Sequence, residues 1–292
     1  MDELKNDIVA EIKHRRPKLS DNSIKTYVSI LSNLYKKLDA DGGIDFFKKN
    51  VKGILHSLGE KHSKTRKSVL AALFVLTEDS EYREQMLSDC KVVNDMYKEQ
   101  KKDPKQVENW IDIKEIEHIY NQLKDTAQKM LDKKIQLDSK LIMDWLLIGL
   151  LGGVSGLSPR RSLDYSVMKI RNYSKTDNYY KAGKFYFNIY KTAGKYGAQE
   201  MAVPPELNKM LKKWIKFNDT DYLLFSSNKN ILSSSQITRT LNKIFGKNVS
   251  TDMLRHIFLT ETYKNVPALQ SMEALATEMG HSMNTALEYV KK

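Results

Sequence analysis

Long apolar runs and paired cysteines are both absent from this sequence of 292 residues. Its one cysteine, Cys90, excludes an intrachain disulfide framework and every zinc site that needs several cysteines, and it suits a reducing compartment. The most apolar run, residues 145–154, is too short to cross a bilayer and is typical of a buried helix. Residues 1–16 offer no apolar stretch suited to a signal peptide. We therefore expect a soluble, intracellular protein, in the cytoplasm or the nucleus, without a membrane partner.

The sequence motifs of several common enzyme classes are also missing. It contains no HExxH metal motif, no CxxC pair, no GxxxxGK(S/T) phosphate loop and no GxGxxG dinucleotide motif. The runs SGLS and SSSQ lack the flanking glycines of a serine nucleophile elbow. Nucleotide hydrolysis, structural zinc and dinucleotide redox chemistry therefore have little support, and we expect neither a metal nor a small-molecule cofactor.

The charge balance is clearly basic. Lysine and arginine total 48 against 36 acidic residues, which gives a net charge of +12 and an isoelectric point near 9.4. The first 107 residues and the remainder both carry a net positive charge. Such a field favours a polyanion or an acidic membrane surface as partner, although charge alone is a weak signal.

The first hundred residues have the pattern of helices. Ser20 and Asp21 are candidate N-caps, and apolar side chains follow them at helical spacing. The pair Gly42-Gly43 interrupts this pattern. Further helices are predicted at residues 44–58, 63–76 and 81–97. Four short helices make a small bundle, so we expect residues 1–103 to form an N-terminal helical domain.

A charged segment separates this bundle from the rest of the chain. Residues 98–110 contain Pro104 and no apolar period, so they are the best candidate for a linker. Beyond it, two strands at residues 184–190 and 199–203 flank the loop KTAGKYGA as a hairpin. The predicted helices lie at residues 113–130, 137–151, 205–217, 234–245, 251–263, 268–279 and 285–289. The predicted fold is mostly α with a small β-sheet, with residues 104–292 as a mixed α/β domain.

Four stretches of this second part carry basic side chains, a histidine and a tyrosine in a fixed order. They are GLSPRRSLDY, IYKTAGK, STDMLRHIFLT and MGHSMNTALEY. This order resembles the tyrosine recombinase and integrase family, which includes Cre, the Xer proteins and lambda integrase. That family has a GLR-x-x-E stretch, a lysine on a β-hairpin, HxLRH, an LGH stretch and then a tyrosine. Each stretch alone is common, but their joint appearance in family order is not.

The resemblance extends to the N-terminal helices and implies a two-domain clamp. Residues 20–27 resemble the S-x-x-T-I-x-x-Y opening of the family's core-binding domain, a SAM-like helical bundle. By resemblance, residues 1–103 would be this DNA-binding domain and residues 104–292 the catalytic domain. The family is common in viruses and mobile elements, and the lysine-rich and asparagine-rich composition suggests an A·T-rich genome.

Arginines are expected at the scissile phosphate. A phosphodiester gains negative charge when it is attacked, and the planar guanidinium group donates two hydrogen bonds to phosphate without losing its own charge. By resemblance, Arg161 and Arg255 fill this role and His281 donates a further bond. We prefer Arg161 because Asp164 follows it by three residues, as the family's acid follows its arginine. Arg160 is the alternative.

A lysine and a tyrosine complete the reaction that the resemblance implies. Tyr289 would be the nucleophile that forms a 3′-phosphotyrosine intermediate, and Lys191 the general acid that protonates the departing 5′ oxygen. Lys195 competes with Lys191 for this role. The reaction is a transesterification that needs neither metal nor ATP.

One position departs from the family pattern. Asp252 stands where the family usually has histidine, sometimes lysine, three residues before Arg255 on the same helix face. An aspartate accepts a proton or orients Arg255, but it repels phosphate. A working variant, a slow enzyme and a helix N-cap without catalytic role stay open. The neighbouring His256 is interpreted as structural.

The resemblance also implies partners. We expect double-stranded DNA as substrate and a homotetramer on DNA, because recombination uses four active sites on two duplexes, with the free protein able to be a monomer. Only three residues follow Tyr289, whereas many relatives carry a further helix that docks on a neighbouring subunit. Two other functions stay open: a type IB topoisomerase, which shares the chemistry but relaxes supercoils as a monomer, and a non-catalytic or catalytically weak DNA-binding relative. Target sequence and direction of reaction are not predicted.

Overall fold

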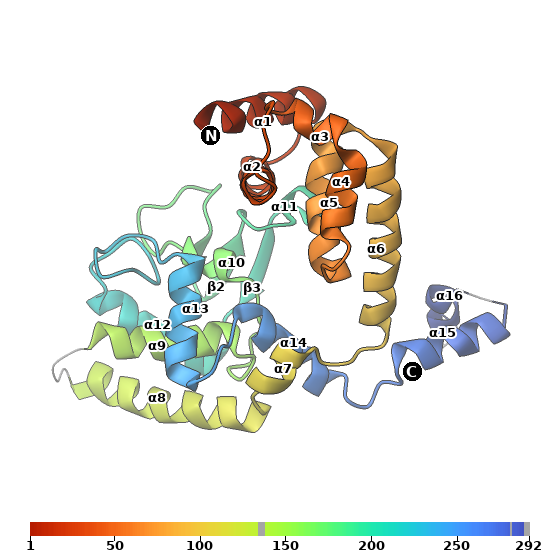
Figure 1. Cartoon of the computed structure of the whole chain (residues 1–292). Coiled ribbons are helices and arrows are strands. Elements are labelled where there is room, and N and C mark those ends of the chain that lie inside the picture. Colours follow the sequence, from red (N-terminus) through yellow and green to blue (C-terminus); the bar gives the residue numbers. More distant parts are fainter. Residues whose placement is uncertain (134–137, 281, 289–292) are drawn as a thin grey trace. The chain divides into compact units, whose positions relative to one another are not determined.

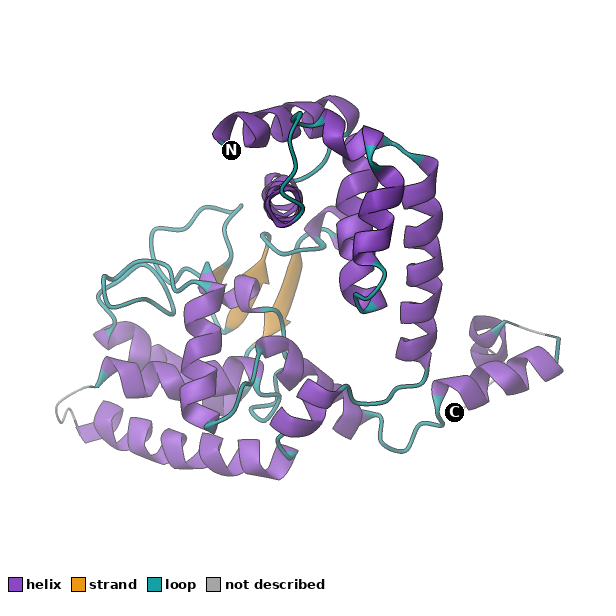
Figure 2. Cartoon of the chain, in the orientation of Figure 1, coloured by secondary structure: helices purple, strands orange, loops and turns teal. Residues whose placement is uncertain are grey.

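The chain is mostly helical and carries one small antiparallel sheet, as the sequence predicts (Figures 1 and 2). The computed structural model describes residues 1–133, 138–280 and 282–288. These divide into two compact units: unit 1 consists of Met1–Lys101 and Pro267–Lys292, and unit 2 consists of Lys102–Val266. No helix among the described residues is long and apolar enough to cross a membrane.

Unit 1 is a bundle of helices. Its second helix begins at the predicted cap, because the Ser20 side chain accepts a hydrogen bond from the backbone N–H of Ser23. The region predicted as one helix at residues 44–58 is instead two short helices that meet at Asn50. The helices are α1 (Asp2–Arg15), α2 (Asp21–Lys37), α3 (Asp45–Lys49), α4 (Val51–Leu58), α5 (Ser63–Thr77), α6 (Ser80–Lys98), α15 (Leu269–Glu278) and α16 (Met283–Glu288).

Aromatic packing closes the core of unit 1. Tyr35, Phe46 and Phe47 contact one another with ring centroids 5.7–5.9 Å apart. The fully buried Tyr82 donates its phenolic O–H to the backbone oxygen of Phe47 at 2.9 Å. A buried ring therefore adds apolar contact and a satisfied polar group to the same core.

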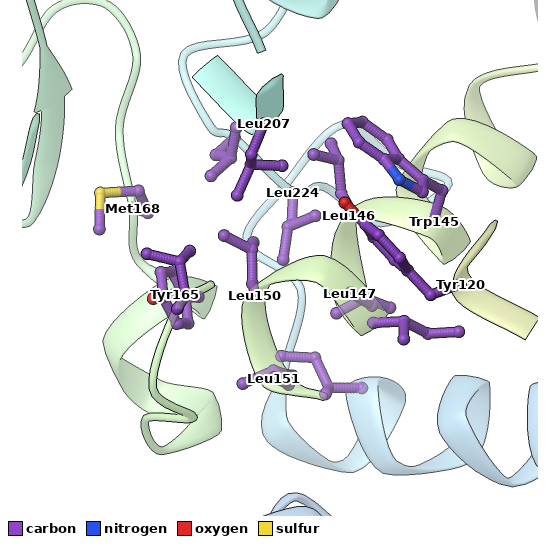
Figure 3. Packing of buried hydrophobic residues seen from close by; sticks show 14 of the residues in the cluster. Tyr120, Trp145, Leu146, Leu147, Leu150, Leu151, Tyr165, Met168, Leu207 and Leu224 are labelled. Carbon is purple, nitrogen blue, oxygen red and sulfur yellow. The ribbon is translucent and has the colours of Figure 1, made fainter. Parts of the chain in front are cut away.

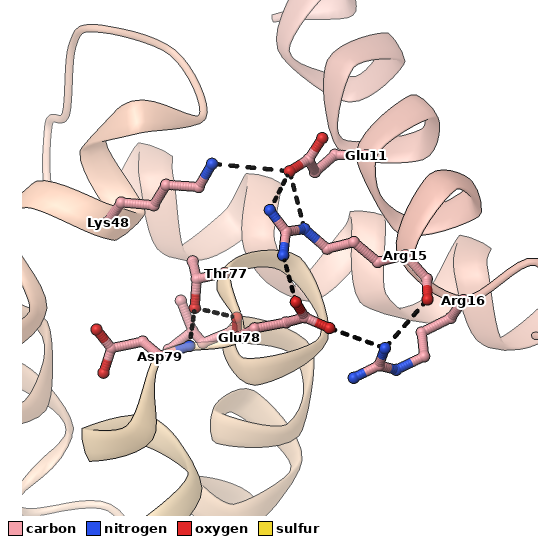
Figure 4. A network of polar contacts seen from close by, with 8 residues as sticks. Glu11, Arg15, Arg16, Lys48, Thr77, Glu78 and Asp79 are labelled. Carbon is pink, nitrogen blue, oxygen red and sulfur yellow. Dashed lines mark hydrogen bonds and ion pairs between the residues drawn. The ribbon is translucent and has the colours of Figure 1, made fainter.

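An ion network holds α1 to the C-terminal end of α5 (Figure 4). Arg15 binds Glu11 at 2.6 Å and Glu78 at 2.8 Å, and Arg16 binds Glu78 at 2.9 Å. The Arg15 hydrogen bond holds the pKa of Glu11 below its usual range, against the effect of burial. Glu78 is the left-handed C-cap of α5, so its position is fixed by the helix end. The charges of Arg15, Arg16, Glu11 and Glu78 are therefore paired with one another.

Unit 2 is built around the buried helix that the sequence predicts from its most apolar run. Its helices are α7 (Pro104–Asn109), α8 (Ile113–Lys133), α9 (Ser139–Leu151), α10 (Ser162–Ser166), α11 (Ala193–Tyr196), α12 (Pro205–Phe217), α13 (Ser234–Phe245) and α14 (Thr251–Thr262). Trp145 of α9 is fully buried and stacks on Tyr120 of α8. Figure 3 shows this core, in which Leu146, Leu147, Leu150 and Leu151 of α9 pack with Tyr165, Met168, Leu207 and Leu224.

The sheet of unit 2 has three antiparallel strands in the order β1 (Tyr179–Lys181), β2 (Lys184–Phe187) and β3 (Gln199–Ala202). Phe185 and Phe187 of β2 are fully buried against the core. The alternate positions Tyr179 and Tyr186 pair across the strands and stack, with centroids 4.6 Å apart. This alternation is the expected signature of a sheet with one buried face.

Two connecting regions differ from expectation. The predicted linker, residues 98–110, contains α7, which begins with a capping box between Asp103 and Gln106. The compact units change after Lys101 and again before Pro267, whereas the sequence suggested one change after residue 103. The C-terminal helices α15 and α16 therefore cluster with unit 1 rather than with residues 104–266.

Candidate functional site

The loop before α10 carries two consecutive arginines with different surroundings. Arg160 donates from Nε to the buried Asp164 Oδ2 at 2.8 Å and from Nη1 to Gln199 Oε1 at 3.0 Å. Its guanidinium carbon lies 4.0 Å from the ring centroid of Phe187 and 5.2 Å from that of Tyr190. Arg161 occupies the N-cap position of α10, and its side chain has no hydrogen-bond or ion-pair partner among the described residues. The Arg160 side chain is thus paired within the protein, whereas the donors of the Arg161 side chain are free among the described residues.

A buried carboxylate gathers positive charge from two separate elements. Asp164 is 2% exposed, and its Oδ1 has no hydrogen-bond partner within the described part of the chain. Burial raises the pKa of Asp164, while the charges of Arg160, Arg161 and Arg255 all act to lower it. Arg255 belongs to α14, more than eighty residues later in the chain. The fold of unit 2 therefore places Arg160 in contact with this carboxylate and lets the charges of Arg161 and Arg255 act on it.

Helix α14 holds Arg255 beside the residue that departs from the family pattern. Arg255 Nη1 donates to Asp252 Oδ1 at 3.2 Å, and His256 Nε2 lies 3.5 Å from Asp252 Oδ2. Asp252 is largely exposed, with 71% of its side chain accessible. The helix is capped by Ser250, which accepts from the Met253 N–H, so the interpretation of Asp252 as the N-cap is wrong.

A glycine allows α14 to approach the end of α9. Gly153 has φ +75°, a backbone conformation that favours glycine. A Cβ atom at this position would clash with the ring of Phe258 on α14. The sequence GG after the apolar run of α9 is therefore needed for the packing of the helix that bears Arg255.

The lysine candidates both lie in the connection between β2 and β3. Lys191 is exposed and has no hydrogen-bond or ion-pair partner among residues that the structure describes. Lys195 is also exposed and lies over the ring of Tyr196, 5.1 Å from its centroid. The hairpin is longer than predicted, because β2 ends at Phe187 and α11 occupies the loop. Tyr190 donates its O–H to Gly197 O at 2.6 Å and so closes the loop at its base.

Asn178 organises the site through its hydrogen bonds, although no sequence motif indicates such a role. It is fully buried and makes four hydrogen bonds. Its Nδ2 donates to Asp164 O at 2.9 Å and to Ile189 O at 2.8 Å, and its Oδ1 accepts from the N–H groups of Asn188 and Ile189. One side chain thereby fastens α10 to the segment that leads into Lys191. A lone asparagine before a strand carries no sequence signal of such a role.

Two of the expected site residues cannot be placed. His281 and Tyr289 lie outside the described residues. The described helices on either side of His281, α15 and α16, belong to unit 1. No group of three or more histidine, cysteine, aspartate or glutamate side chains within the described ranges is arranged to hold a metal ion.

Comparisons with known proteins add little to this geometry. No family model and no curated protein matches the chain. A similar solved structure is the crystal structure of XerA recombinase, at 14% identity and a TM-score of 0.36, over 99% of this chain and 94% of that one. A likeness at this level leaves the function to be argued from the residues themselves.

Proposed function

We propose that this protein is a tyrosine recombinase that cuts and rejoins DNA strands through a covalent bond between Tyr289 and a DNA phosphate. The observation that carries the proposal is that Arg160 contacts the buried carboxylate of Asp164, while the charges of Arg161 and Arg255, whose guanidinium groups keep free donors, act on the same carboxylate. The Arg161 side chain makes no hydrogen bond or ion pair with the described residues, so its donors are available to a ligand. An unpaired guanidinium beside two others is a suitable receptor for a phosphate.

In this proposal Arg161 and Arg255 hold the scissile phosphate. Both guanidinium groups retain free donors, since Arg161 has no partner in the described residues and Arg255 gives only one bond, to an exposed carboxylate. Arg160 is less suitable because its donors meet Asp164 and Gln199. The contacts therefore favour Arg161 over its neighbour as the phosphate ligand.

The chemical step needs a nucleophile and a proton donor. The Tyr289 hydroxyl loses its proton to water as its oxygen attacks phosphorus, and the bond from phosphorus to the 5′ oxygen breaks. Lys191 gives the departing 5′ oxygen a proton and is reprotonated from solvent. The products are a 3′-phosphotyrosine and a free 5′ hydroxyl, and His281 donates a further hydrogen bond to the phosphate. Because one phosphoester replaces another, a 5′ hydroxyl of a second strand reverses the step without ATP.

Asp252 acts in this proposal through Arg255. Its carboxylate accepts the Arg255 hydrogen bond and so limits the orientations of the guanidinium group. The exposure of Asp252 keeps its charge well hydrated, which weakens its repulsion of the phosphate. The substitution of aspartate for the usual histidine is therefore compatible with an active enzyme.

The proposed partner is double-stranded DNA, bound by a homotetramer that joins two duplexes, with the free protein able to be a monomer. The net charge of +12 suits this polyanion, and binding should weaken steeply as salt rises. Residues 1–101 would supply the core-binding domain and residues 102–266 the arginines and the lysine of the catalytic domain.

Covalent trapping tests the proposal. The protein is incubated with a radiolabelled pool of nicked duplexes of randomised sequence, and adducts are resolved on a denaturing gel. We expect an adduct with the native chain, none with Tyr289→Phe, and an unchanged yield with Tyr263→Phe, a control at an exposed tyrosine at the end of α14. An adduct that survives in Tyr289→Phe contradicts the assignment of the nucleophile.

A second assay separates recombination from the other two functions. Supercoiled plasmid without any selected site is incubated with the protein, and a ladder of relaxed forms would indicate a type IB topoisomerase. Salt-sensitive DNA binding without any adduct would indicate a non-catalytic relative. We expect adducts on selected sequences and no general relaxation.

A further inference from the structure

The surroundings of Arg160 suggest a function that the reaction itself does not assign. Arg160 contacts residues on both sides of the β2–β3 connection: Phe187 and Tyr190 come before Lys191 in the chain, and Gln199 comes after it. Its other polar contact, Asp164, belongs to α10, the helix that begins directly after Arg161. One guanidinium group thus joins the two segments that carry the phosphate ligand and the proton donor.

We propose that Arg160 is a positioning residue that fixes the β2–β3 connection, and with it Lys191, against the loop that bears Arg161. The proposal rests on the function proposed above. Arg160 does not touch the phosphate in this view; it determines where the ammonium group of Lys191 lies when the 5′ oxygen leaves. Lys191 follows Tyr190 directly, so a change in the Tyr190 contact is transmitted to it through one peptide bond.

Arginine is the one side chain that meets all of these demands. Its planar guanidinium group packs on aromatic rings, while its N–H donors point outward in the plane of the guanidinium group. Lysine has no such planar group and no such fixed set of donors. The rings of Phe187 and Tyr190 lie at 4.0 and 5.2 Å, and the donors reach Asp164 at 2.8 Å and Gln199 at 3.0 Å. A lysine at this position would keep the charge opposite Asp164 but lose the bond to Gln199 or the ring packing.

Loss of Arg160 should loosen this connection without unfolding the unit. Asn178 still fastens Asp164 O to the backbone of Asn188 and Ile189, and Tyr190 still bonds to Gly197 O. The strands β2 and β3 also keep their register from Lys184↔Ala202 to Phe187↔Gln199. The expected defect is therefore a more mobile segment between Tyr190 and Gln199, with the core intact.

Limited proteolysis measures this mobility without reference to activity. Trypsin cuts after Lys191 and Lys195, and the rate at each site is followed by mass spectrometry of the full-length protein. We expect cleavage in Arg160→Met to be on the order of tenfold faster than in the native chain, and intermediate in Arg160→Lys. Equal rates in Arg160→Met and the native chain overturn the proposal.

Arg171→Met is the matched control. Arg171 is another partly buried arginine of unit 2, and it donates to the backbone oxygens of Asn218, Thr220 and Ile215. Its loss should lower the unfolding temperature about as much as the loss of Arg160, but leave trypsin cleavage after Lys191 unchanged. If both variants speed this cleavage equally, Arg160 is only a stabilising residue.

A change of leaving group tests the link to Lys191. In the duplex recovered from the randomised pool, sulfur replaces the bridging 5′ oxygen of the scissile phosphate, and a thiolate leaves without taking up a proton. On the oxygen substrate we expect Arg160→Met to slow adduct formation on the order of 10²-fold, because displaced catalytic groups cost about that much. On the sulfur substrate its rate should return to within a few-fold of the native rate.

The outcomes distinguish the two proposals. A defect in Arg160→Met that is equally large on both substrates means that Arg160 binds the phosphate directly, which overturns the positioning role. Arg161→Ala should be slow on both substrates and serves as the reference for such a ligand. If the native chain forms no adduct with either substrate, the proposed function fails, while the trypsin rates still decide whether Arg160 holds the connection.

Discussion

Two buried carboxylates, one in each unit, meet arginines in opposite ways. In unit 1, Asp89 is 1% exposed, and Arg66 uses both of its oxygens, at 2.8 Å to Oδ2 and 2.6 Å to Oδ1. In unit 2, Asp164 is 2% exposed, and Arg160 bonds only to its Oδ2. The other oxygen of Asp164 is unbonded in the described residues, although Arg161 and Arg255 act on its charge.

The difference separates a structural ion pair from a site. The Arg66 pair is complete: a third donor of Arg66 meets Gly59 O, and the bond to Asp89 raises the pKa of Arg66. Around Asp164, the charges of three arginines act on one carboxylate, and Arg255 has a further acidic partner in Asp252. Under the proposed function, a bound phosphate would compensate this excess of positive charge. We therefore interpret the complete pair of unit 1 as structural and the incompletely paired cluster of unit 2 as the proposed phosphate site.

The largest effect that sharpens this comparison is expected at Arg161. Arg161→Ala should lower the rate of covalent adduct formation on the order of 10³-fold, as the loss of one transition-state donor does in other enzymes. Its unfolding midpoint should stay close to that of the native chain, since no described residue bonds to this side chain. The two measurements are single-turnover kinetics and thermal unfolding. A stable variant with native adduct kinetics would remove Arg161 from the site.

For the Arg66–Asp89 pair of unit 1 we expect the reverse: a large loss of stability and almost no loss of activity. Arg66→Met leaves Asp89 buried without its partner, which should destabilise the protein by about 3 kcal/mol. Urea unfolding monitored by circular dichroism measures this, and the double variant Arg66→Met with Asp89→Leu should recover part of the loss. Adduct formation at a temperature where the variant is folded should be nearly unchanged. A loss of activity without a loss of stability would contradict the structural assignment.

The sequence predicted most of the longer helices because their signals are local, whereas α1, α10 and α11 were not predicted. The cap at Ser20 and the buried helix α9 are both observed. Strand β1 was missed because its hairpin turns at Ala182-Gly183, two residues with positive φ that lack the usual Asn-Gly or Asp-Gly signal. Helix α7 was missed because a single short helix inside a charged segment has almost no apolar period.

The site was predictable only in part, for a physical reason. The candidates Arg161, Lys191 and Arg255 came from a resemblance in residue order, and the charges of Arg161 and Arg255 both act on the buried Asp164. The contacts of Arg160 and Asn178 join residues up to 39 positions apart, and they depend on burial that no local pattern encodes. His281 and Tyr289 stay predictions.

A smaller effect is expected at Asp252 and decides between two roles. The exposed Asp252–Arg255 pair is worth at most about 1 kcal/mol, so Asp252→Asn should slow adduct formation by no more than about fivefold if the carboxylate only orients Arg255. A general base that accepts the tyrosine proton would contribute on the order of 10²-fold or more. Adduct kinetics between pH 5 and pH 9, compared with the native chain, measure both the size and the pH dependence of the defect.

The smallest effect is expected in the ion network of α1. The Arg15 hydrogen bond lowers the pKa of Glu11 from its usual value of 4.5, so the carboxylate stabilises the folded state above pH 4.5, and this contribution disappears as the pH falls through the lowered pKa. Glu11→Gln should therefore be less stable than the native chain at pH 7 by a few tenths to about 1 kcal/mol, because the pair is partly exposed. The two stabilities should converge as the pH falls below 4. Urea unfolding at pH 7, 5 and 3.5 measures the difference. A gap that widens in acid would mean that Glu11 is destabilising as a carboxylate, which the Arg15 contact does not allow.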